Sequence, residues 1–214
     1  AGGGINLYQW FKGTLTYSAN TATLYKNGAS ITTKVYTGIT IANGANRIGV
    51  RPTANDDFSG LIDEVRIWNR ALSAAEVSSL YFSNEVPTSG LLAEYLFNEG
   101  AGTTANDTSG NGYTGTITGA TYSGDVPMKA RFLQRNANAA ILANGADGAA
   151  GNILSIANNA SLNPTAAVTL EIWFRPTALK AGILFDNSTV GTTNSYFLSM
   201  GADGSINWFS TIGG

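Results

Sequence analysis

The chain has 214 residues, a length that suits one hydrophobic core and a single all-β sandwich. Charged residues make up 12% of it and the formal net charge is -2, so it lacks the basic character that nucleic acids or anionic membranes attract. It contains no cysteine and no histidine, which excludes a disulfide framework, a thiolate nucleophile and a histidine base. A composition rich in small polar residues favours an extracellular location, and the absence of a long apolar run predicts no membrane span.

Residues 14–36 alternate β-branched or aromatic residues with polar ones on either side of an Asn-Gly pair. Asn-Gly tolerates the positive φ angles of a tight turn, so this stretch predicts an antiparallel hairpin. The same pattern recurs along the chain and predicts roughly a dozen short strands. The turn dipeptides are Asn27-Gly28, Asn43-Gly44 and Asp203-Gly204.

One segment departs from strand alternation. Between residues 70 and 81 the apolar residues recur near helical spacing, and Ser73 is followed three residues later by Glu76. This is the pattern of a capping box, so we expect one short helix at 74–82. Pro87 and Gly90 then mark residues 86–90 as a connector between two parts of the chain.

Four stretches resemble motifs of the laminin G-like domain family, which has a concanavalin A-like fold. They are FSGLIDEVRIWNRALSAAEVSSLYFSN (58–84), LLAEYLFNEGAGTTANDTSGNGYTGTITGATY (91–122), VTLEIWFRPTA (168–178) and TATLYKNGASI (21–31). The family's Phe-Asp-Gly signature is replaced by Phe-Leu-Gln-Arg-Asn at 132–136. The resemblance implies an all-β, two-sheet antiparallel jelly-roll sandwich with one short helix.

The motifs stand in an unusual order. The family's late motifs occupy residues 1–85 and its early motifs occupy 91–214, so the chain is expected to carry the two halves of one sandwich in permuted order around the connector. Neither half can cover its inner face and strand edges alone. Three arrangements satisfy this requirement: closure within one chain, exchange of halves between neighbouring copies, or one period of a tandem array.

Catalysis by hydrolases of this fold uses carboxylates at alternate positions of one strand, because retaining glycoside hydrolysis needs two of them about 5 to 5.5 Å apart. No Glu-x-Asp-x-Glu string occurs. The adjacent Asp63 and Glu64 are expected on opposite faces of a strand, and Glu94, Glu99 and Glu171 are isolated in sequence. We therefore expect a protein that is not an enzyme.

The loop at 106–112 reads Asn-Asp-Thr-Ser-Gly-Asn-Gly. Its side-chain and backbone oxygens are of the kind that Ca²⁺ prefers. The resemblance implies a structural calcium site made by this loop with an acidic residue of the closing strand, and the corresponding residues are Asp107, Asn111 and Asp63. The alternative is that Asp107 and Ser109 only cap a turn.

The four tryptophans raise the question of sugar stacking. Trp68 and Trp173 lie in alternating strands beside isoleucines, which favours core packing. Trp208, near the end of the given sequence, is the predicted ligand-binding residue, and Trp10 remains unassigned.

These observations lead to one preferred function and two alternatives. The preferred function is a non-enzymatic extracellular structural or adhesive protein whose partners are other copies of itself, joined by exchanged half-sandwiches into a filament, tube or tandem array. The first alternative is a calcium-dependent carbohydrate-binding or adhesion module that recognises surface glycans. The second, a glycoside hydrolase, lacks a visible carboxylate pair.

Overall fold

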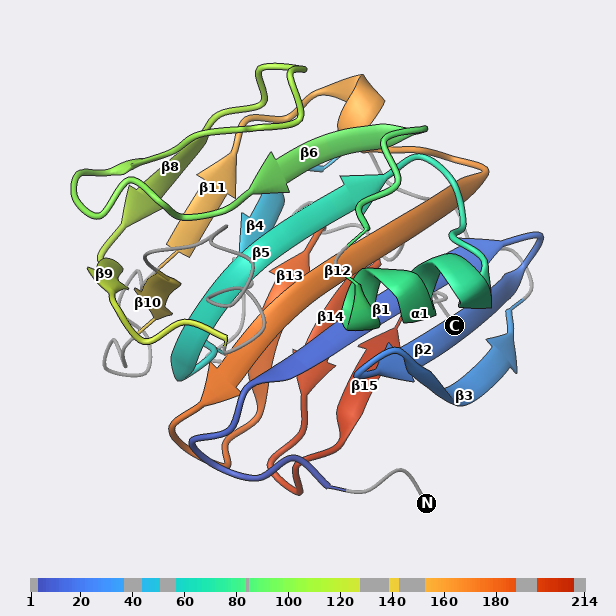
Figure 1. Ribbon diagram of the computed structural model, residues 1–214, viewed down its shortest axis with the longest axis horizontal. Helices are drawn as coiled ribbons and strands as arrows, with labels where there is room; N and C mark the ends of the chain where they lie inside the picture. The colour runs from blue at the N-terminus through green and yellow to red at the C-terminus, as the bar shows by residue number, and fades with distance from the viewer. Residues whose placement is uncertain are drawn as a thin grey trace.

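The computed structural model describes residues 4–36, 44–50, 57–83, 85–127, 139–142, 153–187 and 196–209. Within these ranges, fifteen strands form two stacked antiparallel sheets, and one α-helix lies on the outside of the larger sheet (Figure 1). The predicted all-β sandwich is therefore confirmed. The number of strands exceeds the expected dozen because several are only two to four residues long.

The larger sheet has eight strands in the described residues. Its order is β3 (Ala29–Val35), β2 (Thr21–Lys26), β1 (Phe11–Ser18), β12 (Ala167–Pro176), β5 (Gly60–Trp68), β10 (Ala139–Leu142) and β9 (Thr121–Ser123). The eighth strand, β6 (Leu91–Tyr95), pairs with the same edge of β5 as β10 but further along it.

The smaller sheet has seven strands in the same part of the chain. Its order is β15 (Ile206–Phe209), β14 (Phe197–Met200), β13 (Gly182–Asp186), β4 (Asn46–Ile48), β11 (Ile153–Ile156), β8 (Gly115–Thr118) and β7 (Thr104–Ala105). A short 3₁₀ helix, η1 (Ala160–Leu162), precedes β12.

Strands from before and after the connector alternate in both sheets. In the larger sheet β12 lies between β1 and β5, and in the smaller sheet β4 lies between β13 and β11. The two strands that flank β12 are paired with it along most of its length. The sandwich is therefore built from both parts of the chain. The joint that would link the two ends of the sequence, residues 210–214 and 1–3, lies outside the described residues.

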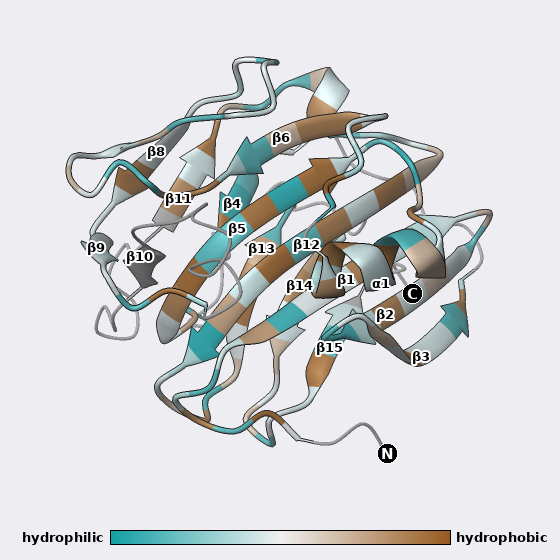
Figure 2. Ribbon diagram, viewed as in Figure 1, coloured by the Kyte–Doolittle hydropathy of each residue, from teal (hydrophilic) through white to brown (hydrophobic). Residues whose placement is uncertain are grey.

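Alternating side chains divide each central strand between two environments, and Figure 2 shows hydrophobic and hydrophilic bands along β5 and β12. Residues such as Ile67, Leu170 and Phe174 point between the sheets and join the main core. A second, smaller cluster forms under the helix on the outer face and includes Trp68 and Leu80. Part of the outer face of the larger sheet is therefore also buried, beneath the helix.

Two predicted turns are confirmed. Asn27 and Gly28 have φ angles of 53° and 80° and connect β2 to β3. Gly204 has a φ of 75° in the turn between β14 and β15, where Asp203 Oδ1 accepts a hydrogen bond from Ser205 N. Asn43 of the third predicted turn lies outside the described residues.

The predicted helix is confirmed with the expected bounds. Helix α1 spans Ala74–Phe82, and the backbone N–H of Glu76 donates to Ser73 Oγ while the Glu76 carboxylate accepts from Ser73 N. The connector then folds back on β5, because Trp68 Nε1 donates to the carbonyl of Pro87 at 2.7 Å. In the described part of the chain no helix is long and apolar enough to cross a membrane.

Candidate functional site

An extra residue in β5 shapes the centre of the outer face. Arg66 lies opposite Glu171 of β12, but Asp63 lies opposite Trp173, so β5 contains one residue more than its partner between these pairs. The irregularity is a β-bulge, and Glu64 within it has a φ of 44°. Val65 consequently joins the main core, while Asp63 and Glu64 both lie on the outer side.

This bulge corrects a prediction. Simple alternation placed Asp63 and Glu64 on opposite faces of the strand. Since the bulge adds one residue to the strand, the alternation is interrupted between them. Glu64 binds Arg66 on the outer face, and Asp63 faces the same way as its cross-strand partner Trp173.

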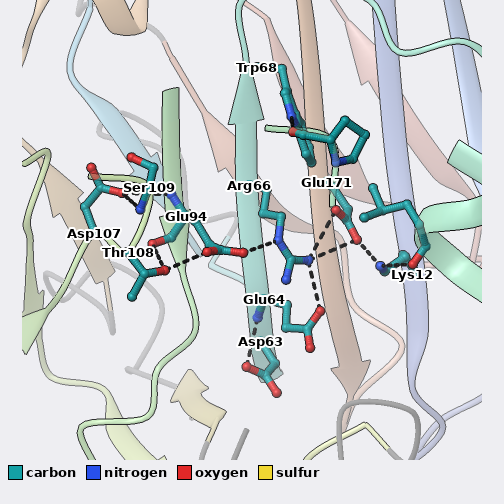
Figure 3. Close-up of polar contacts among 12 residues, drawn as sticks. Lys12, Asp63, Glu64, Arg66, Trp68, Glu94, Asp107, Thr108, Ser109 and Glu171 are labelled. Atoms are coloured by element: carbon teal, nitrogen blue, oxygen red, sulfur yellow. Dashed lines mark hydrogen bonds and ion pairs between the residues drawn. The ribbon is translucent and has the colours of Figure 1, made fainter. Parts of the chain in front are cut away.

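Three carboxylates surround the guanidinium of Arg66 (Figure 3), because Glu171 and Glu94 lie opposite it in the paired strands and Glu64 precedes it by two residues. Arg66 Nε donates to Glu94 Oε1 at 2.7 Å, and Nη1 donates to Glu64 Oε2 at 2.9 Å. The same Nη1 lies 3.4 Å from Glu171 Oε2. The Arg66 side chain is fully buried, and its three partners come from β5, β6 and β12.

Lys12 of β1 extends this cluster toward the helix. Its Nζ forms an ion pair with Glu171 Oε1, lies 3.2 Å from the carbonyl of Leu80 in α1 and sits over the Trp173 ring. The side chain is 1% exposed. Lys12, Glu64, Arg66, Glu94 and Glu171 are called the Arg66 network below.

Electrostatics hold the network together. Burial of Lys12 lowers the pKa of its ammonium group, which the negative charge of Glu171 only partly offsets. Burial alone would also lower the pKa of Arg66, but the charges of its glutamate partners outweigh this, and the pKa rises above its ordinary value. Both cations therefore depend on carboxylates that are themselves out of water.

Two carboxylates of the network lie near each other, as in a hydrolase site, but both are buried. Glu64 and Glu171 share one Arg66 nitrogen, so two carboxylates that are distant in sequence are close in space. Their side chains are only 1% and 0% exposed, and their charge is taken up by Arg66 and Lys12. Both carboxylates therefore face other protein groups rather than the surface of the described structure.

A pattern of alternate carboxylates on one strand does not predict this cluster, because its carboxylates come from three strands. The available signal was Arg66, a cation among buried residues of a strand otherwise rich in apolar side chains. A buried arginine requires carboxylate partners. Which carboxylates they are depends on the pairing of β5 with β12 and β6.

The predicted metal ligand Asp107 closes its own loop. Its Oδ1 accepts from the backbone N–H of Glu94 at 3.0 Å and of Ser109 at 2.9 Å, and Oδ2 accepts from that of Tyr113 at 2.9 Å. Both carboxylate oxygens are thus engaged with backbone amides of the loop and of β6. These hydrogen bonds are those of a capped turn, and a calcium site at this loop stays a prediction.

The other two predicted ligands lie in different surroundings. Asn111 Nδ2 donates to the carbonyls of Leu91 and Leu92, so its amide holds the loop against β6. Asp63 Oδ1 accepts from Glu64 N in the bulge of β5. Asp107 bridges to Tyr95 of β6, on the far side of that strand from β5. In the described ranges no group of three acidic, cysteine or histidine side chains converges on a metal position.

The assignment of Trp208 as a ligand-binding residue is corrected. Trp208 is 7% exposed and belongs to the main core. Its ring packs edge-on against Tyr36 at 4.8 Å and lies 6.2 Å from Tyr17. Because β15 turns this side chain between the sheets, no ring face is open for a sugar. The buried positions of Trp68 and Trp173 agree with the core packing expected for them.

Comparison with known proteins agrees with the architecture. A laminin G family model, described as the concanavalin A-like lectin/glucanases superfamily, matches residues 1–78. No curated protein and no solved structure matches the chain. The matched region contains β1 to β5 and the capping box of α1. Residues 1–78 are therefore similar to the laminin G-like family, and the two stacked antiparallel sheets agree with its concanavalin A-like sandwich, whereas the permuted order of the halves stays a prediction.

Proposed function

We propose that this protein is a non-enzymatic extracellular module with a structural or adhesive role. The observation that carries the proposal is the state of the carboxylates on the outer face: Glu64 and Glu171 are buried and bound to Arg66. Together with Glu94 they tie β5, β12 and β6 to one another through Arg66 instead of facing a substrate. Laminin G-like domains are generally non-enzymatic and extracellular, which agrees with this role.

Hydrolytic activity provides the direct test. Purified protein is incubated with a panel of α- and β-linked polysaccharides, and reducing ends are measured over a day. We expect no release above the buffer control. Release that disappears in the Glu171→Gln variant would contradict the proposal, since it would assign chemistry to the buried carboxylate.

The module is proposed to assemble with other copies of itself by exchange of halves. Support comes from the alternation of strands across the connector, because β12 needs both β1 and β5 as neighbours. The same strand pairs form whether the two halves belong to one chain or to successive chains. Exchange between successive copies would give a ring if the rotation between them closes and an open filament if it does not.

A disulfide introduced across the two halves tests this assembly. Ser18 of β1 and Ala167 of β12 are cross-strand partners, and the chain has no other cysteine to confuse the result. We expect the double variant Ser18→Cys, Ala167→Cys to give a ladder of covalent multimers on a non-reducing gel, with Ser18→Cys alone as the control. A single 22.3 kDa species, with a matching monomer by sedimentation, would exclude exchange.

The calcium-dependent carbohydrate-binding alternative has weaker support. Both carboxylate oxygens of Asp107 accept hydrogen bonds from backbone amides, and Asp63 lies on a different strand, β5.

A further inference from the structure

The ion pair between Lys12 and Glu171 is enclosed on the outer face of the larger sheet. In the pairing of β1 with β12, Lys12 lies opposite Trp173 and Glu171 lies opposite Thr14, so the two charged residues are diagonal neighbours on one face. Their side chains are 1% and 0% exposed. Figure 3 shows the lysine ammonium group directed at the glutamate carboxylate.

The Lys12 nitrogen is held in place by its other neighbours. Nζ donates to the carbonyl of Leu80 in α1 at 3.2 Å and lies 5.3 Å from the centre of the Trp173 ring. Lys12 and Glu171 stand on two central strands that are paired along the whole of β1. Because folding fixes both groups, the amine and the carboxyl carbon stay in contact, as in a well-oriented intramolecular reaction.

The surroundings favour the uncharged forms of the two groups. Burial lowers the pKa of the Lys12 ammonium group and the charge of Arg66 lowers it further, while the negative charge of Glu171 offsets this only in part. Transfer of one proton from Nζ to the carboxylate replaces two buried charges by an amine and a carboxylic acid. The amine is a nucleophile, and the acid is a better acceptor for it than the carboxylate.

Arg66 supplies a cation for the charge that develops on oxygen. Its Nη1 lies 3.4 Å from Glu171 Oε2 and 3.5 Å from Oε1. When an amine adds to the carboxyl carbon, negative charge gathers on the oxygen that stays behind, and a fixed cation stabilises it. Lys12, Glu171 and Arg66 thus bring together a nucleophile, an acyl carbon and a group that stabilises an oxyanion.

We infer that Lys12 and Glu171 condense to form an isopeptide bond between β1 and β12. The Nζ–Cδ bond forms and the Cδ–Oε1 bond of Glu171 breaks. Two hydrogens of the ammonium group leave with Oε1 as one water molecule, and Nζ keeps the third as an amide hydrogen. The step loses one positive and one negative charge and requires no oxidant, reductant or cofactor. The ion pair of the structure is the state before this reaction, and only in that state does Lys12 carry a charge that titrates.

The bond would join a strand that precedes the connector to one that follows it. This inference goes beyond the proposed function and is independent of it, because β1 and β12 pair in the same way within one chain or between exchanged halves. On a denaturing gel, a bond within one chain leaves a monomer and a bond between chains leaves multimers. Both products would contain the same branched peptide.

The intact mass of the purified protein tests the inference after incubation for several days near neutral pH. We expect the wild type to be lighter than its sequence mass by one water molecule. Lys12→Arg keeps the positive charge but lacks the amine, so it should keep the full mass of its sequence. Lys34→Arg is the matched control, since Lys34 is exposed on β3, and it should lose water as the wild type does.

A protease digest then locates the lost water, because an Asp-Gly pair such as Asp203-Gly204 can also lose water by cyclising. We expect one branched peptide that contains both Lys12 and Glu171. The inference is overturned if the wild type has its full sequence mass, if Lys12→Arg loses water equally, or if the loss maps to another site. The wild-type measurement is decisive even if the Lys12 variant fails to fold.

Discussion

Arg66 and Glu171 are direct cross-strand partners on β5 and β12, and their charged groups meet at 3.4 Å with both side chains completely buried. The pair joins a strand that precedes the connector to one that follows it. Taking two charges out of water is costly, so such a pair adds little net stability compared with apolar packing, but loss of one partner leaves the other unpaired.

Replacing Arg66 by Ala should lower the free energy of unfolding by about 3 to 5 kcal/mol, because three carboxylates lose their common partner in the interior. Urea unfolding measures the change. Arg70→Ala is the control, since the Arg70 side chain is 30% exposed and its pair with Glu76 should contribute less than about 1 kcal/mol. Equal losses for the two variants would contradict the structural role given to the network.

Lys12 should impose a pH dependence on stability. Burial lowers its pKa below 10.5 in the folded state, so between the two values the unfolded chain binds more protons and the free energy of unfolding rises with pH. The positive contribution is complete above pH 10.5 and is lost as the pH falls through the lowered value. Subtracting the pH profile of the Lys12→Met variant from that of the wild type isolates the contribution of Lys12 from those of other titrating groups. Parallel profiles for the two proteins would show that Lys12 is not buried as a cation.

The capping box should make α1 sensitive to acid. The hydrogen bond from Arg70 and those from Ser73 hold the pKa of Glu76 at about 2, so its stabilising contribution is present above pH 4.5 and lost as the pH falls toward 2. Glu76→Gln should remove that dependence. Ser73→Ala should cost about 1 kcal/mol, whereas Ser78→Ala within the helix should cost much less. Near-equal effects of the two serine variants in thermal unfolding would refute the cap.

Asp107 should be a structural residue of its loop. Asp107→Ala removes the acceptor for three backbone amides and should cost about 2 kcal/mol or more, while Asp107→Asn retains one oxygen and should cost less. The melting temperature of the wild type should be the same with added Ca²⁺ and with a chelator. A rise with Ca²⁺ that Asp107→Ala abolishes would instead establish the predicted metal site.

The local elements were predictable from the sequence because short-range chemistry determines them. Alternation in residues 14–36, the Asn27-Gly28 turn and the Ser73 to Glu76 capping box each act over a few residues, and each is observed. The motifs of the laminin G-like family likewise predicted the two-sheet sandwich.

The tertiary structure alone decided which side chains meet. The bulge at Glu64 reverses the face predicted for a strand residue, and it became visible only in the register between β5 and β12. Trp208 changed from a surface candidate to a core residue because β15 faces Tyr36 across the sandwich. Strand alternation shows which residues share a face but not whether that face points to the core or to the outside. Packing against the second sheet supplies that direction, and pairing between distant strands therefore gives Arg66 its carboxylate partners.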